Sequence, residues 1–572
     1  MVVRRATYPQ VDPRAIGLMT KALTVVPASL PVEEAVRLGR RRRARLLVAR
    51  IGADWGGVIP ATLEHALRLG LHRVAVRAVL WRMALVEPDT PEVAVRRRLG
   101  PASPFVLLVG PDGPVGAVLL DPDSGGALPL SIAEALGRLP EATRRILRSA
   151  GSLGDELGWA VVGVGGLVRD LLLPGSALSR SDLDLAVEGD GRALARRLAQ
   201  DLGGIVREHS AFLTATVELP KGQRIDVATT RRERYAAPGA LPEVEPASVA
   251  SDLERRDFSV NALAVRLNAG AWGQVVDVAG GLLDLRHRRI RVLHALSFVE
   301  DPTRILRAVR FALRLGCRLD PATRRLLSAA AALPTYATLS GDRLRAEFGA
   351  VLAEPDPAAV LAQLGRMGGF RLLLSTYRFR ASTEGLLRAV AERTAGLPVA
   401  PETREALYVL ALTAHLTPDA VAAWTRRLGL PAAAGARIAR ARDESGDLLA
   451  GLSGAAGPGE AYAVLRRVPE LVAAWAHVCA RGVGTRRHIA EHLRHWREIR
   501  PLLTGDDLQA LGFSPGPALG GLLEELRVAQ VTGRVRHRDD AVAWARAAAA
   551  RRRRRPRRSD TTNQPRPGKR GG

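Results

Sequence analysis

Two stretches decide the expected fold: Gly163-Val-Gly165-Gly166-Leu-Val-Arg169-Asp170 and Ser181-Asp182-Leu-Asp184-Leu-Ala-Val187. The first reads as an apolar strand that turns through paired glycines into a helix. The second reads as a strand in which acids alternate with apolar residues. Because residues i and i+2 of a strand share a face, Asp182 and Asp184 are expected side by side, with the intervening leucines directed into a core. The pattern predicts an α/β unit that carries acids beside a glycine-lined turn.

The paired acids predict a metal site. Two adjacent carboxylates repel each other unless a cation lies between them. Carboxylate oxygens suit Mg²⁺, and a paired-metal site stabilises both oxygens in phosphoryl-type transfer. Asp182 and Asp184 are therefore the candidate Mg²⁺ ligands and catalytic residues; the alternative is a solvated acidic face on an ordinary strand. Asp226, in Gln223–Thr229, is either a third acid near the metals or a satisfied carboxylate at a strand edge, and the sequence leaves both interpretations open.

The paired glycines predict a phosphate site at a helix start. Gly165 and Gly166 let a phosphate approach the backbone where the helix dipole favours anions, and Arg169 adds a charged fork one turn later. The alternative is a tight strand–helix turn without a ligand. The combination with the acids of 182–184 makes the phosphate interpretation the more specific one.

An arginine pair follows in Asp252-Leu-Glu-Arg255-Arg256-Asp257-Phe-Ser-Val-Asn261. Paired guanidiniums can hold a triphosphate, and Asp257 is expected to orient them. The alternative is an ion pair at a helix end, without contact to a ligand.

A basic helix is predicted after Glu300-Asp301-Pro302-Thr-Arg304. Asp301 and Pro302 suit the cap and the first turn, so structure alone explains them. Arg304, Arg307 and Arg310 recur every three residues. Since an α-helix has 3.6 residues per turn, these arginines form a basic stripe that winds gradually around the helix. The stripe is either a ligand-facing surface or a solvated basic face.

The chain is expected to be multidomain. Residues 15–121 carry a weak repeat of about 60 residues, each copy reading as a strand, an amphipathic helix and two further strands. Residues 158–300 alternate strand and helix patterns, and helical periodicity dominates beyond them. The predicted segments are 1–122 (an α+β repeat pair), 123–157 (a linker and a helix over Ser131–Ala150), 158–300 (an α/β head), 301–370 (a helical neck), 371–548 (a helical body and tail) and 549–572 (a basic disordered tail).

Composition indicates a polyanion partner. Lys and Arg number 84 against 58 Asp and Glu, a net charge of +26. Nearly all of the positive charge is Arg, whose planar fork suits phosphate. Aromatic residues are only 4%, which disfavours recognition through many stacked aromatic platforms. Two cysteines, Cys317 and Cys479, exclude a disulfide framework and fit a reducing cytoplasm. No apolar stretch long enough for a signal peptide or a membrane span is present, so no membrane partner is expected.

The ordered set from Gly165 to Phe311 resembles the head and neck of class II tRNA nucleotidyltransferases and bacterial poly(A) polymerases, and the likeness extends to Gly341-Asp-Arg343-Leu-Arg345-Ala-Glu347. It implies a polymerase-β-like head followed by an all-α neck, body and tail. The resemblance assigns Mg²⁺ to Asp182 and Asp184. It implies nucleotide contacts by Gly165, Gly166, Arg169, Arg256, Asn261, Asp301, Arg304, Arg307 and Arg310, with Asp301 and Arg304 reading the base.

The repeat of residues 15–121 resembles a tandem CBS module, which in that family often binds adenosyl ligands. The usual Thr and Asp of the last strand are missing at Gly57–Leu63 and Gly116–Pro122. This departure favours packing or dimerisation over ligand sensing, and a homodimer through the CBS-like region is a further expectation.

The expected reaction is template-independent. Cytosine and adenine both present an amino donor beside a ring-nitrogen acceptor, whereas uracil and guanine present the reverse. An Asp acceptor beside an Arg donor therefore matches CTP and ATP, by about 1–3 kcal/mol for a bidentate pair. An RNA 3′-hydroxyl, with tRNA as the expected substrate, would attack the α-phosphate in line and release pyrophosphate. The helical half and the basic tail would bind RNA through its phosphates.

Several alternatives stay open at this point. CCA addition, CC-only addition, A-only addition and poly(A) synthesis share these motifs, and the segment Arg231–Val249 lies where the family has a flexible loop that influences the product. A non-catalytic RNA-binding or ligand-sensing scaffold is the alternative of another class. His488-Ile-Ala-Glu491-His492, followed by His495, has the form of an inverted zinc-protease motif, but the surrounding arginines disfavour a cation.

Overall fold

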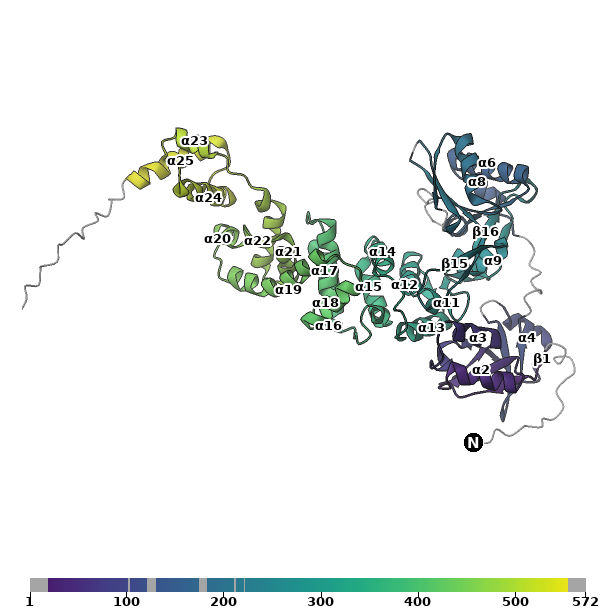
Figure 1. The fold of residues 1–572 in the computed structure, drawn as a ribbon. Coiled ribbons are helices and arrows are strands. Elements are labelled where there is room, and N and C mark those ends of the chain that lie inside the picture. The colour runs from purple at the N-terminus through teal and green to yellow at the C-terminus, as the bar shows by residue number, and fades with distance from the viewer. Residues whose placement is uncertain are drawn as a thin grey trace, which may run out of the picture. The chain divides into compact units, whose positions relative to one another are not determined.

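The computed structural model describes residues 19–100, 103–120, 130–173, 183–209, 212–220 and 222–553 (Figure 1). The chain divides into two compact units. The first runs to Phe379 and includes Ala423–Leu430, and the second holds Arg380–Ala422 and the chain from Pro431 onward. The expected head and the expected neck both lie in the first unit, so this division does not separate them.

The N-terminal module of the first unit contains two four-stranded sheets. Its elements are β1 (Met19–Thr20), β2 (Leu23–Val25), α2 (Val32–Arg41), β3 (Leu46–Ile51), β4 (Asp54–Val58), α3 (Pro60–Arg68), β5 (Trp81–Arg82), β6 (Ala84–Val86), α4 (Glu92–Arg98), β7 (Phe105–Gly110) and β8 (Gly113–Leu119). The sheet orders are β2-β3-β4-β5 and β1-β8-β7-β6. In each sheet, one copy of the sequence repeat supplies two parallel strands and a third strand antiparallel to them. The fourth strand, β5 in one sheet and β1 in the other, comes from outside that copy. Assignment of the module to the CBS family stays a prediction.

Two helices, α5 (Ala133–Gly137) and α6 (Glu141–Leu157), replace the single helix expected over Ser131–Ala150. The prediction was wrong because it ran through Pro140. Proline has no backbone N–H and disfavours a helical residue before it. Pro140 instead precedes the first turn of α6, where the missing N–H costs nothing.

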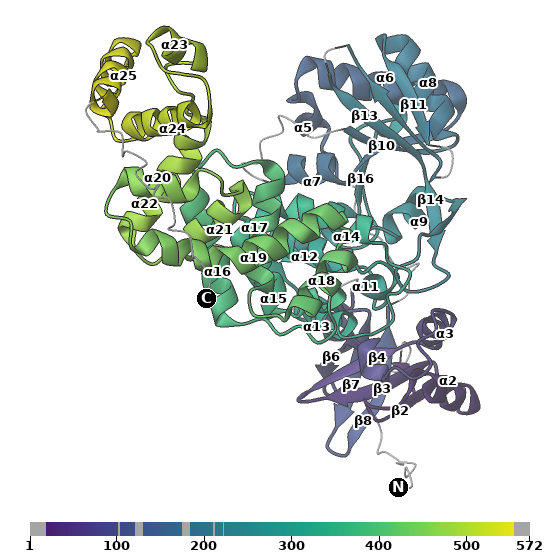
Figure 2. The ribbon, with the colours of Figure 1, turned by 60° about the vertical axis from the view of Figure 1, so that its left-hand side comes forward.

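A seven-stranded sheet forms the centre of the head. Its strands and helices are β9 (Ala160–Val164), α7 (Gly166–Leu172), β10 (Leu183–Glu188), α8 (Gly191–Leu202), β11 (Ile205–His209), β12 (Thr214–Glu218), β13 (Arg224–Thr229), α9 (Val249–Glu254), β16 (Leu263–Arg266), β17 (Val275–Asp277) and α10 (Gly281–Arg286). The order is β11-β12-β13-β10-β9-β16-β17, and β10 and β13 are the parallel pair. Helices α6 and α8 lie together against the sheet (Figure 2).

Strand β10 has the alternation that its sequence predicts. Leu183 and Leu185 are buried, and Asp184 between them is directed to the other face. Ala186, on the same face as Asp184, packs with Val249 and Leu253 of α9. This packing brings α9, and the arginine pair at its end, to the face of the sheet that carries the acid.

The neck follows the head directly. Its elements are β18 (Arg289–Ile290), α11 (Ser297–Glu300), α12 (Arg304–Arg314), β19 (Arg318–Leu319), α13 (Pro321–Ala331), α14 (Gly341–Leu352) and α15 (Pro357–Arg366). Ile305, Ala308 and Val309 anchor α12 with no exposed surface. The N-terminal module contacts this region, where His65 Nε2 lies 2.9 Å from a carboxylate oxygen of Glu300.

The second unit is helical. It contains α16 (Ala381–Thr394), α17 (Pro401–Thr413), the first half of α18 (Pro418–Arg427), α19 (Ala432–Ser453), α20 (Pro458–Leu465), α21 (Glu470–Cys479), α22 (Val483–Arg494), α23 (Gly505–Ala510), α24 (Pro517–Val531) and α25 (Arg538–Arg553). Helix α25 continues past the expected start of the basic tail at 549, and residues 554–572 lie outside the described part of the chain. Within that part, every helix is too short or too polar to cross a membrane.

Candidate active site

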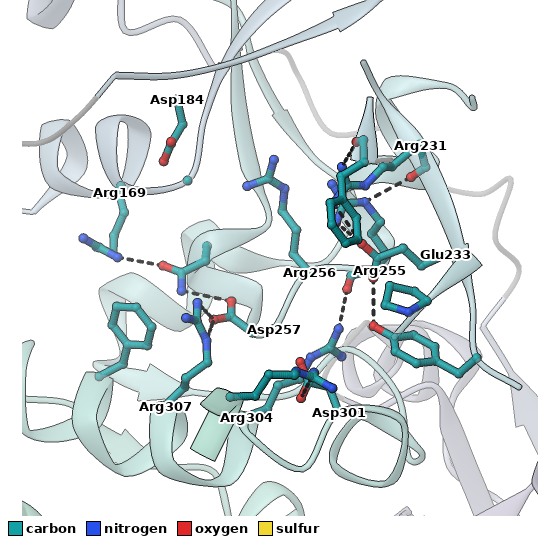
Figure 3. Close-up of a pocket in the computed structure, with 18 of the residues that line it drawn as sticks. Arg169, Asp184, Arg231, Glu233, Arg255, Arg256, Asp257, Asp301, Arg304 and Arg307 are labelled. Carbon is teal, nitrogen blue, oxygen red and sulfur yellow. Dashed lines mark hydrogen bonds and ion pairs between the residues drawn. The ribbon is translucent and has the colours of Figure 1, made fainter. Parts of the chain in front are cut away.

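A cavity of about 560 Å³ lies where the head meets the neck (Figure 3). It brings together nine of the twelve residues singled out from the sequence. These are Gly165, Gly166, Arg169, Asp184, Arg256, Asn261, Asp301, Arg304 and Arg307. Asp226 and Arg310 do not line it, and Asp182 lies outside the described residues.

Glycine at position 165 is required by the turn between β9 and α7. Its φ of 65° lies in the left-handed region that side chains rarely adopt. A Cβ there would also lie 3.4 Å from Nη1 of Arg256 and 3.7 Å from Oδ2 of Asp184. The turn therefore leaves the backbone accessible between a cation and an acid, as the phosphate interpretation expects.

Asp184 is directed into the cavity (Figure 3). Asp226 stands beside it on the neighbouring strand β13. The parallel register pairs the two residues directly, so their side chains share a face. Asp226 accepts a 2.6 Å hydrogen bond from Oγ1 of Thr216 and lies 3.5 Å from Arg224. The described residues contain no cluster of three or more His, Cys, Asp or Glu side chains suited to a metal. Carboxylate oxygens at 184, with 226 adjacent, are nevertheless a donor set that fits Mg²⁺.

A chain of hydrogen bonds links the glycine turn to the neck. Arg169 Nη1 donates to Asn261 Oδ1 at 2.8 Å, and Asn261 Nδ2 donates to Asp257 at 3.0 Å. Arg307 then donates to the other oxygen of Asp257 at 2.6 and 3.0 Å, and to Glu347 at 3.1 Å. These hydrogen bonds hold the guanidiniums of Arg169 and Arg307 at the cavity in fixed orientations (Figure 3).

The arginine pair is oriented by Asp252 rather than by Asp257. Arg255 Nη2 donates to Asp252 at 2.6 Å, and Arg256 Nη2 donates to its other oxygen at 3.0 Å. Burial alone would raise the pKa of Asp252, but the two guanidiniums hold it below its usual value. The expectation for Asp257 was wrong because its carboxylate faces the neck, where Arg307 engages it.

The hairpin β14 (Arg231–Arg234) and β15 (Glu243–Pro246) adds residues that the sequence analysis missed. Arg231, Glu233 and Tyr235 line the cavity. Glu233 accepts from Arg255 at 2.7 Å and from the Tyr235 hydroxyl at 2.8 Å. These three residues are spaced two apart in the sequence. A period of two is typical of one face of a strand, and it is the pattern that could have predicted their shared position.

Asp301 and Arg304 lie together at the neck side of the cavity (Figure 3). Arg343 Nη2 donates to Asp301 at 2.8 Å, which fixes this carboxylate. Arg304 donates to Ser297 Oγ at 2.7 Å and to the backbone oxygen of Arg255 at 2.8 Å. These bonds fix the plane of a guanidinium that has five N–H donors, so a base edge can meet an oriented donor and an oriented acceptor.

Arg310 does not line the cavity, although it shares Glu347 with Arg307. It forms ion pairs with Glu347 at 3.3 Å and with Glu354 at 3.4 Å, and its guanidinium carbon lies 4.9 Å from the ring centroid of Phe311. The expected contact of Arg310 with phosphate or ribose stays a prediction, since its described partners are these acids and the ring.

The cavity is strongly positive. Eight arginines line it against the four carboxylates of Asp184, Glu233, Asp257 and Asp301, an excess of four positive charges among the described lining residues. Guanidiniums stay charged at every pH that a protein tolerates. The arrangement suits a ligand that carries several negative charges, such as a nucleoside triphosphate.

We expect Asp257 to stabilise the fold in a pH-dependent way. Burial would raise its pKa, but Arg307, the Asn261 amide and Arg304 hold the pKa below its usual value. When folding lowers the pKa of an aspartate, its ionised form stabilises the fold. This stabilisation is complete above the ordinary aspartate pKa of about 3.9, and it is lost as the pH falls through the folded-state pKa. The difference in urea midpoint between the wild type and Asp257→Asn should therefore be constant from pH 7 to pH 5 and shrink below about pH 4. An advantage that grows on acidification would contradict the ion pair.

The histidine motif of the second unit lies on α22. His492 is 1% exposed, and burial lowers its pKa to about 4. It is packed as a neutral core residue in this helix.

Comparisons with known proteins decide the family. A family model described as the Poly A polymerase head domain matches residues 161–291. The A-adding tRNA nucleotidyltransferase of Geobacter sulfurreducens is 32% identical over 92% of this chain, which spans 63% of that protein's length. The CC-adding tRNA nucleotidyltransferase of Deinococcus radiodurans is 36% identical over 66% of this chain and 86% of its own.

The chain belongs to the class II tRNA nucleotidyltransferase family. As a member of this family it is a nucleotidyltransferase. Among solved structures, the Thermotoga maritima CCA-adding enzyme complexed with tRNA superposes with a TM-score of 0.61 at 26% identity, over 74% of this chain and all of the other. The resemblance noted in the sequence is thereby confirmed for the head and for the helical region that follows.

Proposed function

We propose that this nucleotidyltransferase transfers adenylate or cytidylate from ATP or CTP to the 3′ end of tRNA without a template. The observation that carries the proposal is the convergence of Asp184, the Gly165 turn and the Asp301–Arg304 pair on one positive cavity. The acid lies at the glycine turn, where a phosphate can approach the backbone, and the oriented donor and acceptor lie at the neck side. One nucleoside triphosphate can therefore meet all three groups.

The side chains of the cavity supply positioning and charge. Arg169, Arg256 and Arg307 would hold the triphosphate, each guanidinium fixed by an amide or a carboxylate partner. The RNA 3′-hydroxyl would attack the α-phosphate in line, and the leaving pyrophosphate would stay in the basic part of the cavity. Fixed cations that need not reorganise during the reaction stabilise the developing negative charge.

Asp184 and Asp182 would hold Mg²⁺, and Asp226 stands next to Asp184 on the parallel strand. When bound, the metal activates the attacking hydroxyl and neutralises charge on the leaving oxygen. The protein's own part is to place the carboxylates of Asp184 and Asp226 on one face of the sheet.

Addition of the terminal A is the product that we favour. The relative matched over 92% of this chain, N-terminal module included, is A-adding. CC addition is the second candidate, because the CC-adding relative is 36% identical over 66% of this chain. Dimerisation through the N-terminal module and RNA binding by the second unit are part of the same proposal.

The test supplies tRNAs that end at the discriminator base, at C or at CC, each with one nucleoside triphosphate. A single A added from ATP to tRNA ending in CC, with no addition of C to the other two, is the expected result. Addition of two C residues to the tRNA that ends at the discriminator base would show that the product is CC rather than A. Elongation beyond three nucleotides would indicate a poly(A) polymerase, and no incorporation on any substrate would overturn the proposal.

A further inference from the structure

A second hollow, of about 640 Å³, lies where the N-terminal module meets the neck. Small-molecule sites typically span about 300–1,000 Å³. Arg82 of β5 lines the hollow together with residues of β18, α12, β19 and α13. Beside it, Arg325 Nη2 donates to the backbone oxygen of Leu80 at 3.0 Å, so the module and the neck are joined at this point. The hollow shares no lining residue with the nucleotide cavity.

The hollow gathers positive charge that described residues do not neutralise. Arg289 and Arg318 stand directly opposite each other on the paired strands β18 and β19. Like charges at opposite positions destabilise a sheet. Within the described chain, neither arginine nor the exposed Arg324 of α13 forms an ion pair, and the carboxylate of Asp320 is engaged by two backbone N–H groups at the start of α13. An anion with several oxygens would relieve the repulsion between these guanidiniums.

The wall of the hollow is apolar. Ala312 and Leu313 of α12 and Leu319 of β19 line it, and Leu313 is 45% exposed. A purely inorganic anion would leave this wall in water, and an RNA duplex would present its phosphates while keeping its bases stacked away from Leu313. A ligand with both a flat base and a charged tail covers the wall and meets the arginines.

We propose that this hollow binds a nucleoside polyphosphate, with the base against Leu313 and the phosphates on Arg289, Arg318 and Arg324. The two sites share α12. Arg307 and Phe311 of this helix line the nucleotide cavity, whereas Val309 and Leu313 line the hollow. A nucleotide in the hollow therefore stabilises one position of the helix that carries the base-facing residues, which makes the hollow a regulatory site.

Hydrogen exchange of the full chain with ATP tests the proposal without relying on catalysis. ATP should protect amides of residues 317–325 at the hollow and, separately, amides of residues 231–235 at the nucleotide cavity. In Arg318→Glu/Arg324→Glu, the ATP concentration that half-protects residues 317–325 should rise more than about tenfold, because two charge-assisted contacts are lost. Residues 231–235 should still be protected, because neither substituted arginine lines the nucleotide cavity. Both arginines are exposed, so the fold should tolerate the substitutions.

Arg404→Glu, which reverses an exposed charge on α17, is the matched control and should leave both protections intact. Inorganic triphosphate should protect residues 317–325 more weakly than ATP does, and equal protection would remove the nucleoside from the proposal. Absence of protection at 317–325, or protection that survives the double substitution, overturns it. A double variant that loses affinity for tRNA with unchanged ATP protection would assign the hollow to RNA instead. Each of these outcomes is independent of nucleotide addition to tRNA.

Discussion

Asp184→Asn should reduce nucleotide addition by about 10²–10³-fold or more, the loss typical for removal of one group that stabilises a transition state. The substitution keeps the size of the side chain and removes its charge, so it would deprive the cavity of its proposed metal ligand without opening a gap. It also removes a negative charge from a cavity lined by eight arginines, which favours the binding of a polyanion. Affinity for tRNA and for ATP, measured by equilibrium binding, should therefore persist while kcat falls.

Asp201→Asn is the matched control, since Asp201 is an exposed acid on α8 of the same head. It should retain full activity. Asp226→Asn decides the question that the sequence left open. A loss as large as that of Asp184→Asn makes Asp226 a third metal ligand. Full activity makes it a structural residue that Thr216 satisfies, inside the sheet rather than at its edge, because β13 lies between β12 and β10. Unimpaired addition by Asp184→Asn would leave the non-catalytic scaffold as the remaining interpretation.

Asp301→Ala should lower discrimination against UTP and GTP by about 1–3 kcal/mol, which is about 5–150-fold in the ratio of kcat/KM values. In the proposed function the carboxylate would accept from the amino groups of adenine and cytosine, and it would repel the carbonyl oxygens that uracil and guanine present there. Removing the acceptor removes both effects. Steady-state kinetics with each nucleoside triphosphate on one tRNA substrate measure the ratio.

Arg343→Gln should produce a smaller loss of selectivity, because Arg343 fixes the Asp301 carboxylate at 2.8 Å but leaves the acceptor in place when it is removed. Asp342→Ala, at an exposed acid of the same helix start, should not change the ratio. Unchanged selectivity in Asp301→Ala would place base recognition elsewhere in the cavity.

The parts of the site that follow from local periodicity were predictable. The alternation of β10, the glycine turn after β9 and the polar face of α12 are each set within about ten residues, and the structure brings their side chains to one cavity. The partner of the arginine pair was also within reach of local reasoning. Arg255 and Arg256 lie three and four residues after Asp252, and side chains at these spacings meet on a helix.

Contacts between distant segments were not predictable from one sequence. Arg307 pairs with Asp257, fifty residues earlier in the chain, and Arg343 pairs with Asp301 across forty-two residues. Which of many acids a given arginine meets depends on how the neck packs on the head, and this packing has no local period. The same reason explains the missed contribution of Tyr235, whose place in the cavity depends on the fold of the β14–β15 hairpin.

The ion pair between Asp257 and Arg307 also limits which segments of the gene can be exchanged by recombination. The family model ends at residue 291, yet the buried carboxylate of Asp257 has its guanidinium partner sixteen residues beyond that point. A gene fragment that encoded the matched segment alone would leave a charged group without its counterion in the interior. Selection should therefore keep these two segments in one reading frame, so that recombination exchanges them together or not at all.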